Sequence, residues 1–365
     1  MIYHGTVTGI GTAAHFVVKD AQHHGLVQQP LTAADHESAF SMLLNWFDQH
    51  DEAFRLIAVG HRVVHGGILF KAPVIIDALV FAQLEQLIPL APLHQPHNLT
   101  PIKWLQQQKP QLPQIACFDT AFHATQPAIA QLFALPRALT ETGIKRYGFH
   151  GLSYEYIARV LPDFIGQLPE RVIVAHLGNG ASMAALKQGR SLATTMSFTA
   201  LDGLPMGTRC GAIDAGVILH LLNNGMNLDT LTHLLYHRSG LLGVSDISSD
   251  MQTLLQSDSP QASEAIELFI YRLGRELGSL VAALGGLDAL VFTAGIGENS
   301  HLIRTKICAN AQWLGIKLDE PANQQHHSRI STPDSLVSVW IIPTDEEKMI
   351  AQHAHALLKT GCEPK

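Results

Sequence analysis

The chain has 365 residues, enough for two compact domains that each bury a core. Hydrophobic residues make up 47% and charged residues 15%, which excludes a disordered chain, and the formal net charge of −7 without a basic run argues against a nucleic-acid partner. No apolar stretch approaches the ~20 residues of a membrane span, and the first residues lack a signal peptide's basic and apolar segments. We therefore expect a cytoplasmic protein, and the four scattered cysteines predict reduced thiols.

Five short apolar runs predict buried strands that carry polar residues at their C-terminal ends. Between them, apolar residues at i, i+3, i+4, i+7 spacing from Ile266 to Leu284 predict a helix that begins after Ser259 and Pro260. This pattern is typical of an α/β protein, in which ligands gather outside the carboxyl ends of strands. The five runs are LIAVGHRVVHGG at 56–67, QIACFDTAFH at 114–123, RVIVAHLGNGAS at 171–182, LDALVFTAGIGENS at 287–300 and VSVWIIPTDEE at 337–347.

Near the middle of the chain lies the turn-rich stretch TETGIKRYGFHG at 140–151. Its sequence is compatible with a crossing between domains and equally with a ligand loop, and both interpretations stay open.

Two glycine motifs each follow a predicted strand directly: HLGNG at 176–180 and GIGEN at 295–299. Glycine lets backbone amides approach phosphate oxygens closely, although tight turns also require it. Two such motifs together favour a phosphate site more than either one alone.

Charged residues accompany these motifs. Arg62 and Arg209 stand close to glycines, where a guanidinium can bind a phosphoryl or carboxylate group or pair with a nearby Asp. Asp119 and Asp214 lie in apolar surroundings, which is costly for a carboxylate that is neither paired nor functional. Glu346, which with Glu347 opens a predicted helix, either binds Mg²⁺ or complements the helix N-terminus.

Three other patterns are rejected. GIGTAA at 9–14 resembles a dinucleotide fingerprint, but the following HFVVKD predicts a strand where the fingerprint needs a helix. HRVVH at 61–65 lacks the Glu of a zinc-protease helix, and its valines favour a strand. No GxxxxGK[ST] is present, so a nucleotide site would not be a P-loop. Glycine motifs, arginines, carboxylates and a histidine together suit phosphoryl transfer.

Eight motifs in this order closely resemble the acetate kinases of the acetokinase family, and the likeness covers nearly the whole chain. They are GHRVVHGG at 60–67, APLH at 91–94, FDTAFH at 118–123, RYGFHG at 146–151, HLGNG at 176–180, MGTRCG at 206–211, TAGIGENS at 293–300 and IPTDEE at 342–347.

The resemblance implies reversible phosphoryl transfer between ATP and acetate, giving acetyl phosphate and ADP, with Mg²⁺ or Mn²⁺ as the metal. It also implies the two-domain actin-like, sugar-kinase-like (ribonuclease H-like) α/β fold with the active site in the interdomain cleft, and a homodimer. The expected domains are residues 1–119 plus 348–365 and residues 120–347.

The resemblance also implies individual roles. Arg62 and Arg209 resemble the arginines that bind the acid's carboxylate and the transferred phosphoryl group, Asp119 an essential carboxylate, His150 the histidine that stabilises the transition state, and Glu346 the Mg²⁺ ligand. The remaining positions are the phosphate loop His176, Leu177, Gly178, Asn179 and Gly180; the adenosine site Asp250, Gly295, Ile296, Gly297 and Asn299; and the acid's pocket Val64, Leu93 and Phe149.

Three departures from the family pattern stand out. Ala200 in FTALDGL replaces a pocket proline, which would loosen the acid site, and SSDMQT at 248–253 replaces SNDFRD beside the nucleotide. The family's opening strand and Ser-rich phosphate loop have no counterpart at the start. From this we expect feeble activity at best, and roughly two dozen further residues encoded upstream, the reach of a strand and its hairpin. The alternatives are a catalytically impaired nucleotide-binding relative and a propionate-preferring kinase.

Overall fold

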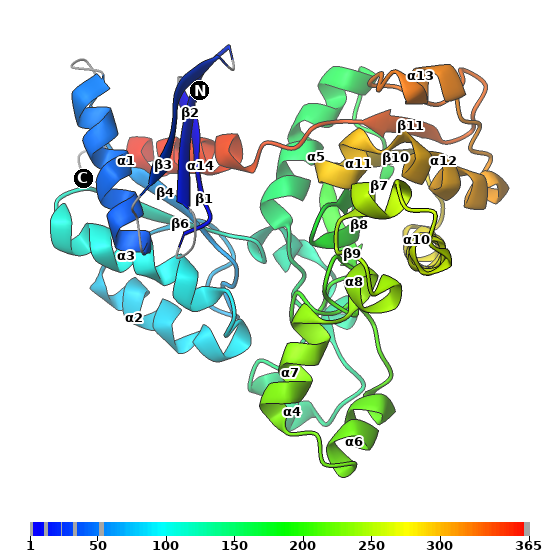
Figure 1. Cartoon of the computed structure of the whole chain (residues 1–365), viewed down its shortest axis with the longest axis horizontal. Helices are drawn as coiled ribbons and strands as arrows, with labels where there is room; N and C mark the ends of the chain where they lie inside the picture. The colour runs from blue at the N-terminus through cyan, green and yellow to red at the C-terminus, as the bar shows by residue number, and fades with distance from the viewer. Residues whose placement is uncertain (1–2, 11–13, 23, 32–34, 51–54, 361–365) are drawn as a thin grey trace. The chain divides into compact units, whose positions relative to one another are not determined.

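The computed structural model describes residues 3–10, 14–22, 24–31, 35–50 and 55–360. The chain divides into two compact units, whose elements are drawn in Figure 1. The seven residues after His65 belong to unit 2, which the sequence did not predict. The domain boundaries after residues 119 and 347 stay a prediction. Unit 1 comprises Met1–His65, Pro73–Cys117 and Ile350–Lys365, and unit 2 comprises Gly66–Ala72 and Phe118–Met349.

The described residues of unit 1 form two three-stranded sheets. One has the strand order β1-β2-β3 and is antiparallel, and the other has the order β4-β6-β5. The elements are β1 Tyr3–Thr8, β2 Ala14–Asp20, β3 Gly25–Leu31, α1 His36–His50, β4 Val59–Val63, β5 Val74–Ile75, α2 Ala78–Gln86, the 3₁₀ helix η1 Ile88–Leu90, α3 Gln95–Gln108, β6 Gln114–Phe118 and, from Ile350 onward, α14 Glu346–Thr360.

Two of the rejected patterns lie in these strands. The segment after GIGTAA forms β2, so the prediction of a strand there is confirmed, although residues 11–13 lie outside the described part. His61 lies within β4, so the HRVVH segment begins as a strand and is not the helix that a zinc protease would need.

Unit 2 contains the larger share of the chain. Its elements are η2 Ala121–Thr125, η3 Ala128–Gln131, α4 Arg137–Glu141, α5 Gly151–Ile165, β7 Arg171–Leu177, β8 Ala181–Lys187, β9 Arg190–Thr194, α6 Ala215–Asn223, α7 Leu228–His237, α8 Gly240–Ser245, α9 Met251–Leu255, α10 Pro260–Leu284, β10 Ala289–Thr293, α11 Ala294–Asn299, α12 His301–Asn310, η4 Gln312–Leu314, α13 Glu320–Gln324, β11 Ser338–Ile341 and the first turn of α14.

The sheet of unit 2 has the order β11-β10-β7-β8-β9. Strand β10 runs parallel to both β11 and β7, and all five of its residues are buried, as is typical of a strand covered on both faces. Strand β8 returns antiparallel to β7. The strand predicted in the run at 171–182 is therefore confirmed as β7, and the run continues through a turn at Gly178–Gly180 into the start of β8, which was not predicted.

Helices cover this sheet on both sides (Figure 1). From α5, Tyr154 and Ile157 pack with Val172 and Val174 of β7 in one buried cluster. The long helix α10 packs against β7, β8 and β9. The apolar stripe predicted from its periodicity is buried, Pro260 stands in its first turn, and Gly285 ends it at φ 72°, so this prediction is confirmed.

Candidate active site

The first glycine motif forms the turn of the β7–β8 hairpin. Gly178 N–H donates to Gly180 O at 3.0 Å, which closes the turn. Strand β7 pairs with β10 so that His176 lies opposite Thr293, two residues before the second glycine motif. The two motifs therefore lie at the same edge of the sheet, as the strand pattern predicted.

His150 lies against this hairpin. It precedes helix α5 in the left-handed conformation, at φ 57°, which is rare for residues other than glycine and common at functional sites. Its ring stacks on that of His176 with centroids 4.2 Å apart, and its Nδ1 lies 2.8 Å from Ser182 Oγ. The side chain is buried, so these contacts fix the ring against the β7–β8 hairpin.

Arg209 approaches the same loop. A Cβ atom at Gly180 would lie 2.8 Å from Arg209 Nη2 and 3.3 Å from His150 Nε2, so only glycine leaves room for both side chains. Arg209 Nη1 donates to Ala200 O at 2.6 Å, and Gly207 N–H donates to Asn179 O at 3.2 Å. An imidazole and a guanidinium thus converge on one turn, an arrangement suited to a phosphoryl group.

Asp119 is 1% exposed and contacts Gly151, the residue that follows His150. Its backbone oxygen accepts from Gly151 N–H at 2.9 Å, and a Cβ at Gly151 would come within 2.2 Å of that oxygen. The glycine after His150 is therefore required for close approach to Asp119. Neighbouring Phe149 is buried, and its carbonyl oxygen lies 2.9 Å from His123 Nε2. Burial of the His123 ring lowers its pKa to about 4.

A cavity of about 800 Å³ opens beside the loop. Both glycine motifs contribute to it, which brings six of the predicted nucleotide residues together. The predicted residues are Gly178, Asn179, Asp250, Gly295, Ile296 and Asn299. Ser249, Met251 and Gln252 of the SSDMQT segment and Ser300 of the TAGIGENS motif also line the cavity. The lining is completed by Leu255, Gln256, His301 and Leu302, which the sequence motifs did not include.

The second glycine motif differs from the expected loop because it forms helix α11. Asn299 Nδ2 donates to Gly295 O at 2.9 Å within this helix, and a Cβ at Gly295 would meet nothing within 4 Å. Gly297 and Leu177 are buried and do not line the cavity.

Asp250 is the N-cap residue of α9. Its carboxylate caps α9 by accepting from the N–H and the hydroxyl of Thr253, at 3.0 and 2.9 Å. These hydrogen bonds lower the pKa of Asp250. Asp214 likewise caps α6 by accepting from Gly216 N–H at 2.6 Å, and it is exposed, which corrects the expectation of a carboxylate in apolar surroundings.

Two residues that support α11 were missed. Arg304 is fully buried and donates to the carbonyl oxygens of Gly297 and Glu298, at 2.9 and 2.8 Å, and to Asn323 Oδ1 at 2.7 Å. The Glu298 carboxylate accepts from the N–H groups of Ala294 and Thr344. No local sequence pattern reveals Arg304, because its acceptors at Gly297 and Glu298 are backbone oxygens and its side-chain acceptor, Asn323, lies 19 residues further along the chain.

Glu346 and Glu347 lie in the first turn of α14, so the predicted helix is confirmed. Glu346 is half-buried and Glu347 is exposed. Acidic residues at this position stabilise a helix through its dipole, and the same carboxylates can face a cation.

The remaining predicted residues belong to unit 1. Arg62 is exposed on β4. The buried Val64 donates its N–H to Asn98 Oδ1 at 3.0 Å, which ties the end of β4 to α3, and Leu93 lies two residues before that helix. Asn98 was not foreseen.

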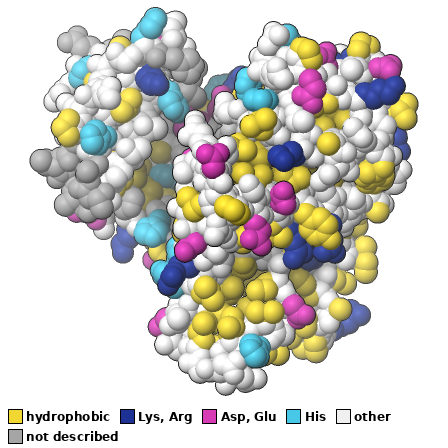
Figure 2. Space-filling model, turned by 45° about the vertical axis from the view of Figure 1, so that its right-hand side comes forward, with side chains coloured by type: hydrophobic (Ala, Val, Ile, Leu, Met, Phe, Trp, Pro, Cys, Tyr) yellow, Lys and Arg dark blue, Asp and Glu magenta, His cyan; other side chains and the backbone are white. Residues whose placement is uncertain are grey.

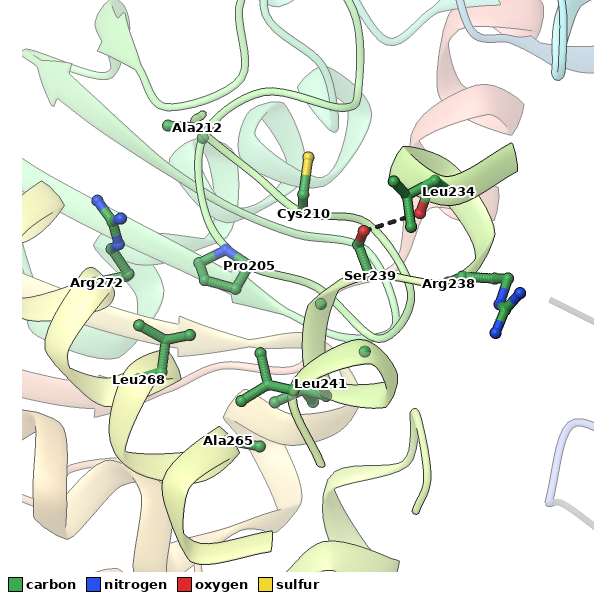
Figure 3. Close-up of a pocket in the computed structure, with 14 residues that line it drawn as sticks. Pro205, Cys210, Ala212, Leu234, Arg238, Ser239, Leu241, Ala265, Leu268 and Arg272 are labelled. Atoms are coloured by element: carbon green, nitrogen blue, oxygen red, sulfur yellow. Dashed lines mark hydrogen bonds between the residues drawn. The ribbon is translucent and has the colours of Figure 1, made fainter. Parts of the chain in front are cut away.

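A second cavity, of about 370 Å³, is lined in part by the segment that carries Pro205, Cys210 and Ala212 (Figure 3). Pro205, Leu241 and Leu268 give it an apolar wall. Arg238 and Arg272 extend from opposite sides of it and do not converge (Figure 3). None of the predicted site residues lines this cavity.

The α/β fold and the convergence of His150 and Arg209 on a phosphate-type turn beside a cavity define the class, a phosphotransferase. The chain matches the acetokinase family over residues 2–352. The chain therefore belongs to the acetokinase family.

Relatives with close overall likeness agree. An acetate kinase of Rhodopseudomonas palustris is 55% identical over 99% of this chain and 92% of its own, and one of Nitrobacter hamburgensis is 50% identical over 97% and 89%.

Solved structures extend the agreement to the fold. A propionate kinase of Francisella tularensis aligns with TM-score 0.91, 37% identity and coverage of 96% and 92%. An acetate kinase of Porphyromonas gingivalis aligns with TM-score 0.88, 35% identity and coverage of 98% and 93%. The predicted actin-like α/β kinase fold is confirmed. Among the described residues, no helix has the length and apolar character of a membrane span.

Proposed function

We propose that this chain is an acetate kinase, which transfers a phosphoryl group reversibly between ATP and acetate. The observation that carries the proposal is the turn at Gly178–Gly180. Its first two residues line the large cavity, and its third receives His150 and Arg209. A nucleotide in the cavity would place its terminal phosphate at this turn.

In the proposed reaction, a carboxylate oxygen of acetate attacks the γ-phosphorus of ATP while the bond to the bridging oxygen of ADP breaks. Catalysis of such a transfer consists mainly of positioning and neutralisation of charge on the equatorial oxygens. Arg209 and the loop amides stabilise that charge, His150 donates a hydrogen bond, Arg62 binds the acid's carboxylate, and Asp119 is the essential carboxylate of the site.

We propose Mg²⁺ as the metal, with Mn²⁺ as a substitute, held by Glu346 together with the phosphates. Within the described residues no group of three or more His, Cys, Asp or Glu side chains could hold an ion. Mg²⁺ at kinase sites commonly takes only one or two carboxylates and the substrate's phosphates, so one half-buried carboxylate fits that role. The ion would neutralise charge on the phosphates when bound.

Acetate is the proposed acid, with Val64, Leu93 and Phe149 around its methyl group. The relatives named acetate kinase reach 55% identity, whereas the solved propionate kinase has 37%. One methylene is worth about 10- to 200-fold in kcat/KM in an apolar pocket, so propionate should be a poorer substrate. Restoring the family's proline with Ala200→Pro should sharpen this preference, and an unchanged acetate-to-propionate ratio would contradict the pocket assignment.

We also propose a homodimer that uses α6. This helix, AGVILHLLN, has no buried residue, and Leu219 on it is 62% exposed. Figure 2 shows hydrophobic side chains gathered toward the bottom of the view, the part of unit 2 where Figure 1 places α6 and α7. Large exposed apolar patches mark protein interfaces. Leu219→Glu should therefore convert a dimer to a monomer in light scattering, and a monomeric wild type would contradict the proposal.

A cytoplasmic location completes the proposal. Cys117, Cys210 and Cys308 form no disulfide in the described part of the chain, which is compatible with a compartment where thiols stay reduced. Cys362 lies outside the described residues.

The test is a coupled assay of ADP formation, with trapping of acetyl phosphate as its hydroxamate. The purified chain should require Mg²⁺, ATP and acetate for both signals. A parallel calorimetric titration with ATP distinguishes an active kinase from a catalytically impaired nucleotide-binding relative. Tight ATP binding without formation of acetyl phosphate would identify the impaired relative and overturn the proposal.

A further inference from the structure

A line of side-chain contacts runs from the core of unit 2 to the phosphate loop. The Tyr154 hydroxyl contacts Ser182 Oγ, and Ser182 Oγ lies 2.8 Å from His150 Nδ1. Tyr154 and Ser182 are each 0% exposed. The opposite nitrogen of the ring, Nε2, is the one that lies closest to Gly180.

The number of protons decides the direction of these hydrogen bonds. Each hydroxyl carries one proton, and among the described residues neither hydroxyl has another hydrogen-bond partner. If His150 Nδ1 carried a proton and donated it to Ser182, one of the two hydroxyl protons would have no acceptor. A buried hydroxyl without a partner costs about 1–3 kcal/mol. Both hydroxyl protons find an acceptor only if Tyr154 donates to Ser182 Oγ and Ser182 donates to His150 Nδ1.

We infer that Tyr154 and Ser182 are positioning residues that hold His150 neutral, with its proton on Nε2, the atom that faces the phosphate loop. The inference deepens the proposed function and rests on it for the consequence, a neutral hydrogen-bond donor directed at the transferred phosphoryl group.

The surroundings agree with a neutral ring. The Arg209 guanidinium and His150 Nε2 both lie near Gly180, so a positive charge on His150 would be repelled by the positive charge of Arg209. The His176 ring stacks on His150. Burial raises the pKa of Tyr154, which keeps its hydroxyl protonated as a donor over the working range of pH. His176 has its own hydroxyl neighbour, Ser153 Oγ, at 2.8 Å from Nδ1.

The test reads the tautomer of His150 directly by ¹⁵N NMR of the resting protein, with the signal assigned by its loss in His150→Gln. Wild type should show a protonated Nε2 and an unprotonated Nδ1. Tyr154→Phe keeps the Ser182 donor and should keep this pattern. The double variant Ser182→Ala/Tyr154→Phe leaves no unpaired hydroxyl and removes the donor, so the preference for Nε2–H should be lost.

Kinetics supply the second readout. The double variant should lose about tenfold in kcat with little change in the KM for ATP, because the misdirected ring acts on transfer and not on nucleotide binding. The single variant Tyr154→Phe, which keeps the Ser182 donor, should have a kcat close to that of wild type. Ser191→Ala is the matched control, since Ser191 Oγ makes the same 2.8 Å contact with Nδ1 of another buried histidine, His123, and should leave the His150 signal unchanged.

A protonated Nδ1 or an imidazolium at His150 in wild type at neutral pH would overturn the inference, and so would a double variant with an unchanged tautomer. Because wild type alone answers the first question without substrate, the result is independent of whether the double variant folds. A correct tautomer in a protein that forms no acetyl phosphate would instead overturn the proposed function.

Discussion

The two glycine motifs of unit 2 look alike in sequence and differ in structure. HLGNG is a crowded turn, where a Cβ at Gly180 would collide with Arg209 and come close to His150. GIGEN is part of a helix, where a Cβ at Gly295 would meet nothing within 4 Å and would point into open space beside the large cavity. The first motif receives two side chains at a tight turn, which suits the proposed phosphoryl site, and the second leaves open space beside the cavity proposed for the nucleotide.

This difference comes from the side chains that surround each motif. Arg209 and His150 reach the first motif from outside its hairpin, whereas the second is supported from behind by the buried Arg304. Glycine in a sequence shows that space or an unusual φ is needed, but not what fills the space. We therefore expect substitutions at the first motif to change turnover and substitutions at the second to change nucleotide affinity.

The largest effect is expected from Arg209→Ala. Loss of one charged donor at developing negative charge costs about 10² to 10³ in kcat. The melting temperature should stay close to that of wild type, because the side chain is only partly buried and works through charge. Steady-state kinetics and thermal unfolding measure both, and Arg238→Ala, at the edge of the second cavity, is the control. Near-normal turnover in Arg209→Ala would break the distinction between the two motifs.

Arg304→Met tests the support of the second motif. The substitution leaves the carbonyl oxygens of Gly297 and Glu298 and the Asn323 side chain without their buried donor. Unsatisfied buried groups of this kind cost about 2–4 kcal/mol in total, measurable as a lower free energy of unfolding in urea. The KM for ATP should rise in the folded fraction. A variant as stable as wild type would show that α11 needs no such clamp.

Gly180→Ala sharpens the comparison at the first motif. The new methyl group would lie 2.8 Å from Arg209 Nη2, and the flexible arginine would move away with little cost to folding. Misplacement of a catalytic group by about 1 Å can cost ~10² in rate, so kcat should fall while the KM for ATP changes little. Unchanged kcat would mean that Arg209 does not act from its position at this turn.

The smallest effect is expected from the matched substitution Gly295→Ala. Its methyl group enters open space, so folding and kcat should be preserved. Because it would occupy space beside the nucleotide cavity, the KM for ATP should rise by about tenfold at most. A fall in kcat comparable to that of Gly180→Ala would remove the difference between the two motifs.

Periodicity predicted much of the fold. The strands at β7, β10 and β11 and the helix α10 follow apolar patterns that burial enforces, and each is confirmed. The strand β8, ASMAALK, was missed because it is as apolar as β7, and nothing in its sequence shows that the chain turns back after β7. Direction is decided by pairing between strands, which a local pattern does not contain.

The site divides in the same way. Motifs located the glycine turns and the residues that lie around them, and the structure brings His150, His176, Gly180 and Arg209 together. The roles of these residues stay proposals. Asp214 was misjudged because a helix cap and an unpaired carboxylate look alike in sequence. Arg304, Ser182 and Tyr154 were missed because their importance lies in burial and in tertiary contacts that a local sequence pattern does not contain.

The most direct test of the account is ³¹P NMR of the purified chain with ATP, Mg²⁺ and acetate. The account predicts that the γ-phosphate signal of ATP declines while those of acetyl phosphate and ADP grow together, and that acetyl phosphate with ADP reverses the change. Formation of inorganic phosphate alone, or no change under conditions where ATP binds, would contradict the claim that this chain transfers phosphoryl groups to acetate.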